Sequence, residues 1–218
     1  MGATPPATVA GPATDPAVDP DSDPDRAVIT RAMNDLRAAF DEALVALADT
    51  PIPVGVVGLL RDVQAQVADV AYLGGYVGDM TFPHLADATD EAWRFAVQAG
   101  EALGQATSDT TFDGATPAGS VLSELARRVD TAVGRINEAG AYTVTEGLDA
   151  VWHAQNALAR LVRIAADAMP PDSQDPVATV LRTAARDAHT AARGFDRVHR
   201  TVRAWLQDDA ADEPCPDD

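Results

Sequence analysis

The sequence predicts an all-α protein, and three observations lead to this fold class. Hydrophobic residues make up 46% of the chain and are mostly Ala, Val and Leu. Aromatic residues make up only 5%, whereas sheet proteins rely on β-branched and aromatic side chains. Six segments repeat apolar residues every three or four positions. Because their connections are mostly short, we expect an up-and-down antiparallel bundle of about six helices.

The composition divides the 218 residues into one domain and two flanks. Residues 1–24 are rich in Pro, Asp, Ala and Thr, a composition that buries too little apolar surface to offset the entropy of ordering. We expect a disordered arm there, a single helical-bundle domain over 25–207, and an acidic disordered tail over 208–218.

The first two expected helices are marked by long apolar stripes. One helix begins near Asp25 and must end before the Thr-Pro-Ile-Pro segment at 50–53. A second helix covers about 54–73, where the glycines of 74–78 provide a stop signal. The stripes consist of Ile29, Met33, Leu36, Phe40, Leu44 and Leu47, and of Val56, Leu60, Val63, Val67 and Val70.

The remaining helices are bounded by capping residues and prolines. A third helix is expected at about 88–106. Thr116 and Pro117 resemble the N-cap and first residue of a fourth helix. Thr143 and Glu146 have the spacing of a capping box for a fifth. Asp175 and Pro176 open a sixth helix, over about 176–207, which would be roughly 45 Å long.

Composition also excludes several kinds of chemistry. All sixteen cationic residues are Arg, so neither the lysine of a P-loop nor a Schiff-base lysine is present. The single cysteine, Cys215, allows no internal disulfide. No signal peptide or run of eighteen apolar residues appears, so we expect a cytoplasmic protein with no membrane partner. The Ala, Arg and Asp usage suggests a high-GC or salt-adapted source.

The sixth helix carries the most unusual feature, a line of basic residues in a chain of net charge −18. On a helical wheel, Val180, Phe195 and Val202 define its core side. His199 falls beside that core, nearly 100° from the basic line. The basic line, called the ridge below, lies on the opposite side and consists of Arg182, Arg186, His189, Arg193, Arg197 and Arg200.

The ridge makes the charge distribution strongly asymmetric. Residues 176–207 hold six arginines against Asp187 and Asp196, so this segment carries +4 and the remainder of the chain −22. Opposite charges on one molecule favour oriented association with an acidic protein or with a second copy. Nucleic acid is less favoured, because the acidic remainder would repel a duplex.

Two pairs in the sixth helix resemble the Arg-x(4–6)-His motif of HEPN-family ribonucleases, which are small all-α bundles. They are Arg182 with His189, and Arg193 with His199; Thr183 and Gly194 follow the two arginines. The resemblance implies transesterification at RNA phosphate, with these four residues as the catalytic set.

Other sites receive less support from the sequence. No histidine follows a Glu at the spacing of a di-metal bundle, so we expect no metal and no cofactor. Tyr76, Phe82 and His84 form an aromatic segment that could line a small pocket or plug the end of the bundle.

The sequence therefore predicts a non-enzymatic interaction module: an adaptor, scaffold, assembly component or inhibitor. The ridge would contact an acidic protein partner, or a second copy in a homo-oligomer, through charge-assisted hydrogen bonds. The HEPN-like ribonuclease is the alternative.

Overall fold

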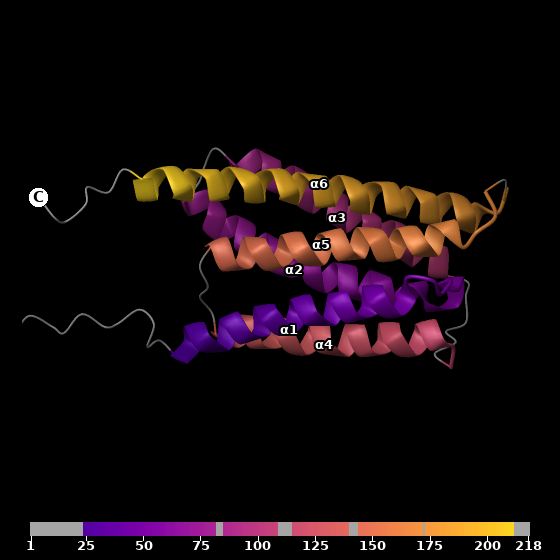
Figure 1. The fold of residues 1–218 in the computed structure, drawn as a ribbon. Coiled ribbons are helices and arrows are strands. Elements are labelled where there is room, and N and C mark those ends of the chain that lie inside the picture. The colour runs from indigo at the N-terminus through magenta and orange to yellow at the C-terminus, as the bar shows by residue number, and fades with distance from the viewer. Residues whose placement is uncertain (1–23, 82–84, 109–114, 140–143, 172, 212–218) are drawn as a thin grey trace, which may run out of the picture.

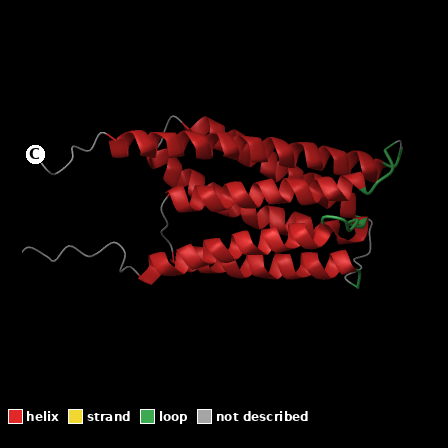
Figure 2. Cartoon of the chain, in the orientation of Figure 1, coloured by secondary structure: helices red, strands yellow, loops and turns green. Residues whose placement is uncertain are grey.

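A computed structural model describes residues 24–81, 85–108, 115–139, 144–171 and 173–211, and these ranges form helices joined by short connections, with no strand (Figures 1 and 2). The prediction of an all-α bundle is confirmed. The elements are α1 (Pro24–Leu47), the 3₁₀ helix η2 (Val54–Val56), α2 (Val57–Thr81), α3 (Ala86–Thr107), α4 (Pro117–Ala139), α5 (Val144–Asp167) and α6 (Pro176–Ala211).

The six α-helices run along a common axis, and successive helices alternate in direction (Figure 1). In this view α1 and α4 lie at one edge, α6 at the other, and α5 between them, with α2 and α3 behind. α6 packs against α3 and α5, and α5 also contacts α1 and α2. The last two helices therefore lie side by side and present a common outer surface.

The predicted start signals of two helices are present as hydrogen bonds. The Gly119 N–H donates to Thr116 Oγ1 at 3.0 Å, which makes Thr116 the N-cap of α4. The Val177 N–H donates to Asp175 Oδ1 at 2.9 Å at the start of α6. Thr143 lies outside the described residues.

Two predicted helix ends were wrong. α2 does not stop at the glycines of 74–78 but continues to Thr81, just ahead of the segment that contains Pro83. Glycine lowers helix stability by only about 1 kcal/mol per residue, whereas the residue before a proline is sterically disfavoured in the helical region. α6 continues past residue 207 to Ala211, because neither Gly nor Pro interrupts the sequence before Pro214.

The core is built from the predicted stripes. All eleven stripe residues of the first two helices are buried, as are Leu122, Leu125, Val129, Val133 and Ile136 of α4. On α6, Phe195 and Val202 are buried, as predicted, and Val198 is buried beside them, while Val180 is partly exposed. Apolar periodicity therefore identified the inward face of these helices.

Small residues bring α3 and α6 unusually close together. Ala92 and Ala99 of α3 and Ala188 and Ala192 of α6 are buried. A Cβ atom placed on Gly194 would lie 2.7 Å from Ala92 Cβ, closer than packed carbon atoms approach. Gly194 is thus required by helix packing at the position that follows Arg193.

One polar contact crosses the interior. The side-chain amides of Gln64 on α2 and Gln155 on α5 hydrogen-bond reciprocally at 3.0 and 3.3 Å, and both residues are fully buried. Because a buried amide needs a partner, this pair fixes the relative position of the two helices.

The structure describes neither the expected arm nor most of the expected tail, which fall in residues 1–23 and 212–218. Across the described helices, none combines the length and hydrophobicity needed to cross a bilayer.

Candidate functional site

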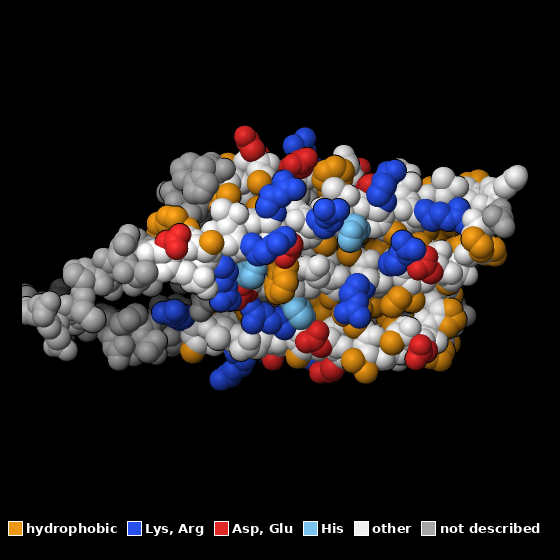
Figure 3. Space-filling view, turned by 45° about the horizontal axis from the view of Figure 1, so that its top comes forward, with side chains coloured by type: hydrophobic (Ala, Val, Ile, Leu, Met, Phe, Trp, Pro, Cys, Tyr) orange, Lys and Arg blue, Asp and Glu red, His pale blue; other side chains and the backbone are white. Residues whose placement is uncertain are grey.

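The ridge lies on the outer side of α6, as predicted. Arg186, His189, Arg193, Arg197 and Arg200 are exposed and Arg182 is partly exposed. Figure 3 shows basic side chains spread over a broad face that covers α6 and extends across α5 toward α1. The basic surface is therefore wider than one helix.

Some ridge residues bind neighbouring groups of the fold. Arg200 pairs with Asp196 one turn earlier, and Arg186 Nε lies 3.1 Å from Asp187 Oδ1. Arg182 donates to the backbone carbonyls of Pro170 and Pro171 at 2.8 and 3.0 Å. Arg182 therefore holds the α5–α6 connection against α6.

The side chains of His189, Arg193 and Arg197 make no hydrogen bond or ion pair with any residue that the structure describes. They line a small cavity of about 310 Å³ between α3 and α6, together with Glu91 and Phe95 of α3. Their polar groups are thus available to a bound partner.

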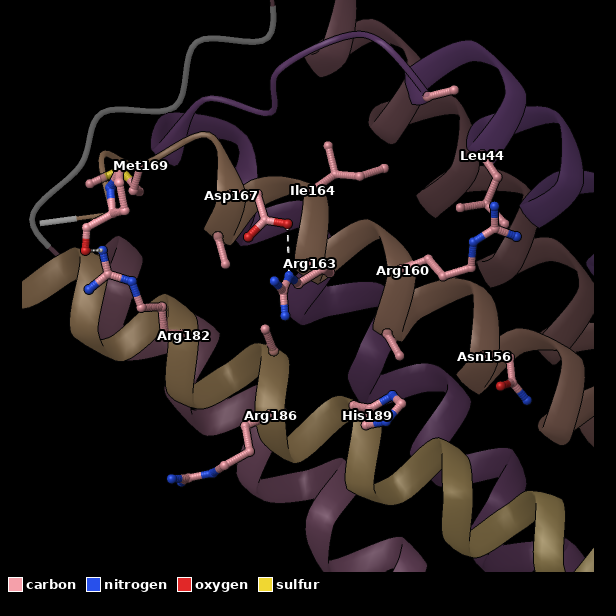
Figure 4. Close-up of a pocket in the computed structure, with 15 residues that line it drawn as sticks. Leu44, Asn156, Arg160, Arg163, Ile164, Asp167, Met169, Arg182, Arg186 and His189 are labelled. Carbon is pink, nitrogen blue, oxygen red and sulfur yellow. Dashed lines mark hydrogen bonds and ion pairs between the residues drawn. The ribbon is translucent and has the colours of Figure 1, made fainter. Parts of the chain in front are cut away.

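A larger cavity of about 1190 Å³ lies between the C-terminal half of α5, α6 and the end of α1 (Figure 4). Arg160 and Arg163 of α5 join Arg182, Arg186 and His189 of the ridge around it. Apolar side chains also line it, namely Leu44, Ala48, Ala159, Ile164, Ala166, Met169, Pro171 and Ala185. The cavity combines cationic groups with an apolar floor.

The cationic groups around this cavity differ in their partners. Arg163 Nε lies 2.7 Å from Asp167 Oδ2, one turn later on α5. Arg160 has no hydrogen bond or ion pair within the described part of the chain, and it extends toward Leu44 (Figure 4). In the same view His189 points toward α5, whereas the Arg186 guanidinium points away from it.

Arg160 and Arg163 were not predicted as site residues. Both lie on the polar strip of α5, a signal that is readable on a wheel, but only the packing of α5 beside α6 joins that strip to the ridge. The two arginines and the six ridge residues are called the arginine face below.

His199 is not part of the arginine face. Its side chain is 14% exposed, its ring stacks on Trp152 with centroids 4.7 Å apart, and its Nε2 hydrogen-bonds to Asp149. This confirms the prediction that His199 lies beside the core, and it gives His199 a role in joining α5 to α6.

Asp149 forms ion pairs with arginines of two other helices. Besides His199, it pairs with Arg203 of α6 at 2.6 Å and with Arg37 of α1 at 3.4 Å. Burial raises the pKa of this carboxyl, but hydrogen bonds from His199 and Arg203 outweigh burial and hold the pKa below its usual value. The cluster ties α1, α5 and α6 together.

The two predicted Arg–His pairs are placed differently. Arg182 and His189 line the same large cavity. Arg193 lines the cavity beside α3, whereas His199 contacts Asp149 and Trp152 of α5. The first pair thus lines one cavity, with its two members about two helical turns apart, and the members of the second pair lie at different sites.

The remaining predicted sites are not developed further by the structure. The described residues contain no group of three His, Cys, Asp or Glu side chains arranged to hold a metal. Phe82 and His84 lie outside the described residues, as does the Tyr76 side chain, although residue 76 belongs to α2 rather than to the expected loop.

The comparisons with known proteins identify no relatives: no family model matches the sequence, and no curated protein or solved structure shows significant similarity.

Proposed function

We propose that this chain is a cytoplasmic, non-enzymatic interaction module that binds an acidic protein surface through its arginine face. The observation that carries the proposal is that the side chains of Arg160, Arg193, Arg197 and His189 are exposed and have no hydrogen bond or ion pair with a described residue. Acidic residues outnumber arginines by 34 to 16 in this chain, but residues 176–207 hold only two acids for six arginines. Arginines that pair with no described residue favour contact with carboxylates of another molecule.

A direct binding measurement tests this proposal. The probe is a dye-labelled oligo-aspartate of about twelve residues, long enough to span several cations of the face, followed by fluorescence anisotropy at several salt concentrations. We expect affinity to fall steeply as ionic strength rises, because exposed charges are screened. Sedimentation of the protein alone at low and moderate salt separates binding to a partner from salt-sensitive self-association.

A pair of charge-matched variants locates the binding surface. The test variant combines Arg160→Glu, Arg193→Glu and Arg197→Glu. The control combines Arg127→Glu, Arg128→Glu and Arg135→Glu on α4, which changes net charge equally. We expect the test variant to lose at least tenfold in affinity and the control to lose less than twofold. Equal losses would mean that net charge, rather than the arginine face, governs binding.

The ribonuclease alternative retains one supporting observation, the shared location of Arg182 and His189 on the large cavity. Its test is cleavage of a labelled oligouridylate by the wild-type chain and by His189→Ala. Cleavage lost in a folded His189→Ala variant would favour the enzyme. Oligouridylate that binds uncleaved, and more tightly than oligo-aspartate of equal charge, would instead favour a nucleic-acid partner.

A further inference from the structure

We infer that the large cavity receives an acidic amphipathic helix from the partner protein, an inference that rests on the proposed function and specifies its partner. The apolar side of that helix would lie on the cavity floor. Its flanking carboxylates would meet the arginine face.

The dimensions of the cavity suit a helical segment. Its lining extends along α5 from Asn156 to Asp167, which is about 16 Å along the helix axis, and continues to Met169 beyond the end of the helix. Its volume of about 1190 Å³ exceeds the roughly 300–1,000 Å³ of small-molecule pockets. A partner helix of three to four turns would match this length.

The apolar floor of the cavity would contact the apolar side of the partner helix. Leu44 of α1, Ile164 of α5, Met169 after α5 and Ala185 of α6 contribute to one continuous lining. A helix that presents apolar residues at positions i, i+3, i+4 and i+7 places them in a stripe suited to such a floor. An extended acidic chain would leave the floor in water.

The basic side chains around the cavity would contact carboxylates on the flanks of the partner helix. Arg160 of α5 extends toward Leu44 of α1, and His189 lies on α6, so basic side chains of two helices border the cavity (Figure 4). The one carboxylate in the lining, Asp167, is already paired with Arg163. Carboxylates of the partner helix would therefore meet basic side chains that have no partner among the described residues, with little opposing charge.

The test compares two labelled peptides with oligo-aspartate. The first is a fifteen-residue helix with a leucine stripe flanked by glutamates, and the second has the same composition with its leucines scattered. We expect the striped peptide to bind at least tenfold more tightly than the scattered one. The double variant Arg160→Glu/His189→Glu should remove this binding.

Two further variants distinguish the contribution of the apolar floor to peptide binding from the contribution of the charges. Ile164→Gln should weaken the striped peptide at least fivefold without changing oligo-aspartate binding. Val45→Gln is the control, because Val45 is 80% exposed on α1 and does not line the cavity. Circular dichroism and thermal midpoints check folding, and Met169→Gln replaces Ile164→Gln if the latter is unfolded.

The outcomes distinguish the two proposals. Equal binding of striped and scattered peptides, or equal effects of Ile164→Gln and Val45→Gln, overturns the amphipathic helix while leaving the acidic partner in place. If neither the peptides nor oligo-aspartate bind at low salt, both proposals fail.

Discussion

The α4 edge of the bundle and the arginine face use the same residue in different ways. All three arginines of α4 are paired: Arg127 with Glu124, Arg128 with Glu42, and Arg135 with Asp35, at 2.6, 2.6 and 3.1 Å. On the arginine face, Arg160, Arg193 and Arg197 make no such contact with any described residue.

The difference follows from the local supply of carboxylates. Residues 117–139 contain three arginines and three acids, whereas 176–207 contain six arginines and two acids. Arginines on the α4 edge therefore form ion pairs within the fold, while several on the arginine face pair with no described residue. Matched substitutions on the two sides of the bundle can break or sharpen this contrast.

The largest expected effect is at Asp149, where cations of the α5–α6 side do support the fold. Asp149→Ala removes the shared acceptor of Arg37, His199 and Arg203, so we expect the free energy of unfolding to fall by about 2 kcal/mol. Asp130→Ala on α4 should cost at most about 0.5 kcal/mol, because that carboxylate is exposed. Urea denaturation measures both. Equal losses would contradict the special role of Asp149.

Substitutions at two glycines compare the packing of α6 with the packing of α4. Gly194→Ala should lower the free energy of unfolding by about 1–2 kcal/mol, since the new Cβ would clash with Ala92. A Cβ atom on Gly134 would meet no neighbouring group within 4 Å, so Gly134→Ala should raise stability by about 0.5–1 kcal/mol. Thermal and urea unfolding report the sign. A stabilising Gly194→Ala would show that α3 and α6 tolerate separation.

The third prediction concerns acid. The folded-state pKa of Asp149 lies below its unfolded value, so its stabilising effect is present above the unfolded pKa, about 4, and is lost as pH falls through the folded pKa. Because the carboxylate is partly exposed, we expect wild type to exceed Asp149→Asn by only about 1 kcal/mol at pH 7. Urea unfolding of both proteins from pH 7 to pH 2 should show this difference shrinking below about pH 4. A constant difference would contradict the assignment.

The smallest expected effect on the free energy of unfolding comes from replacing single arginines. One of them is paired with an acid, and the other has no ion pair with a described residue. Arg128 is 25% exposed and bound to Glu42, so Arg128→Ala should cost about 0.5 kcal/mol. Arg193→Ala should cost nothing measurable, because the Arg193 side chain is exposed and has no hydrogen bond or ion pair with a described residue. When urea denaturation is repeated at high salt, the loss of stability caused by Arg128→Ala should be smaller. A clear loss from Arg193→Ala would mean that the fold depends on this residue.

Periodicity predicted much of the fold because burial repeats with the helical turn. The stripe from Ile29 to Leu47 and the outward direction of the ridge both follow from one helix considered alone. The end of α2 did not follow, because glycine lowers helix stability by only about 1 kcal/mol per residue and so does not by itself end a helix.

The candidate site was harder to predict because it depends on which helices are neighbours. Arg160 joins the ridge only through the packing of α5 beside α6, and Asp149 meets Arg37 only where α1 contacts α5. The angle of His199 on the helical wheel predicted a position beside the core, but its partners Asp149 and Trp152 belong to a different helix. Spacing within one helix contains no information on these contacts.

The close approach of α3 and α6 at Gly194 has an entropic consequence for recognition. Ala92 leaves α6 little room to turn about its own axis at this point, so the backbone that carries Arg193 and Arg197 is already fixed before any partner arrives. Binding would then restrict the rotamers of long side chains but not the helix beneath them. A pre-ordered scaffold of this kind lowers the conformational cost of association.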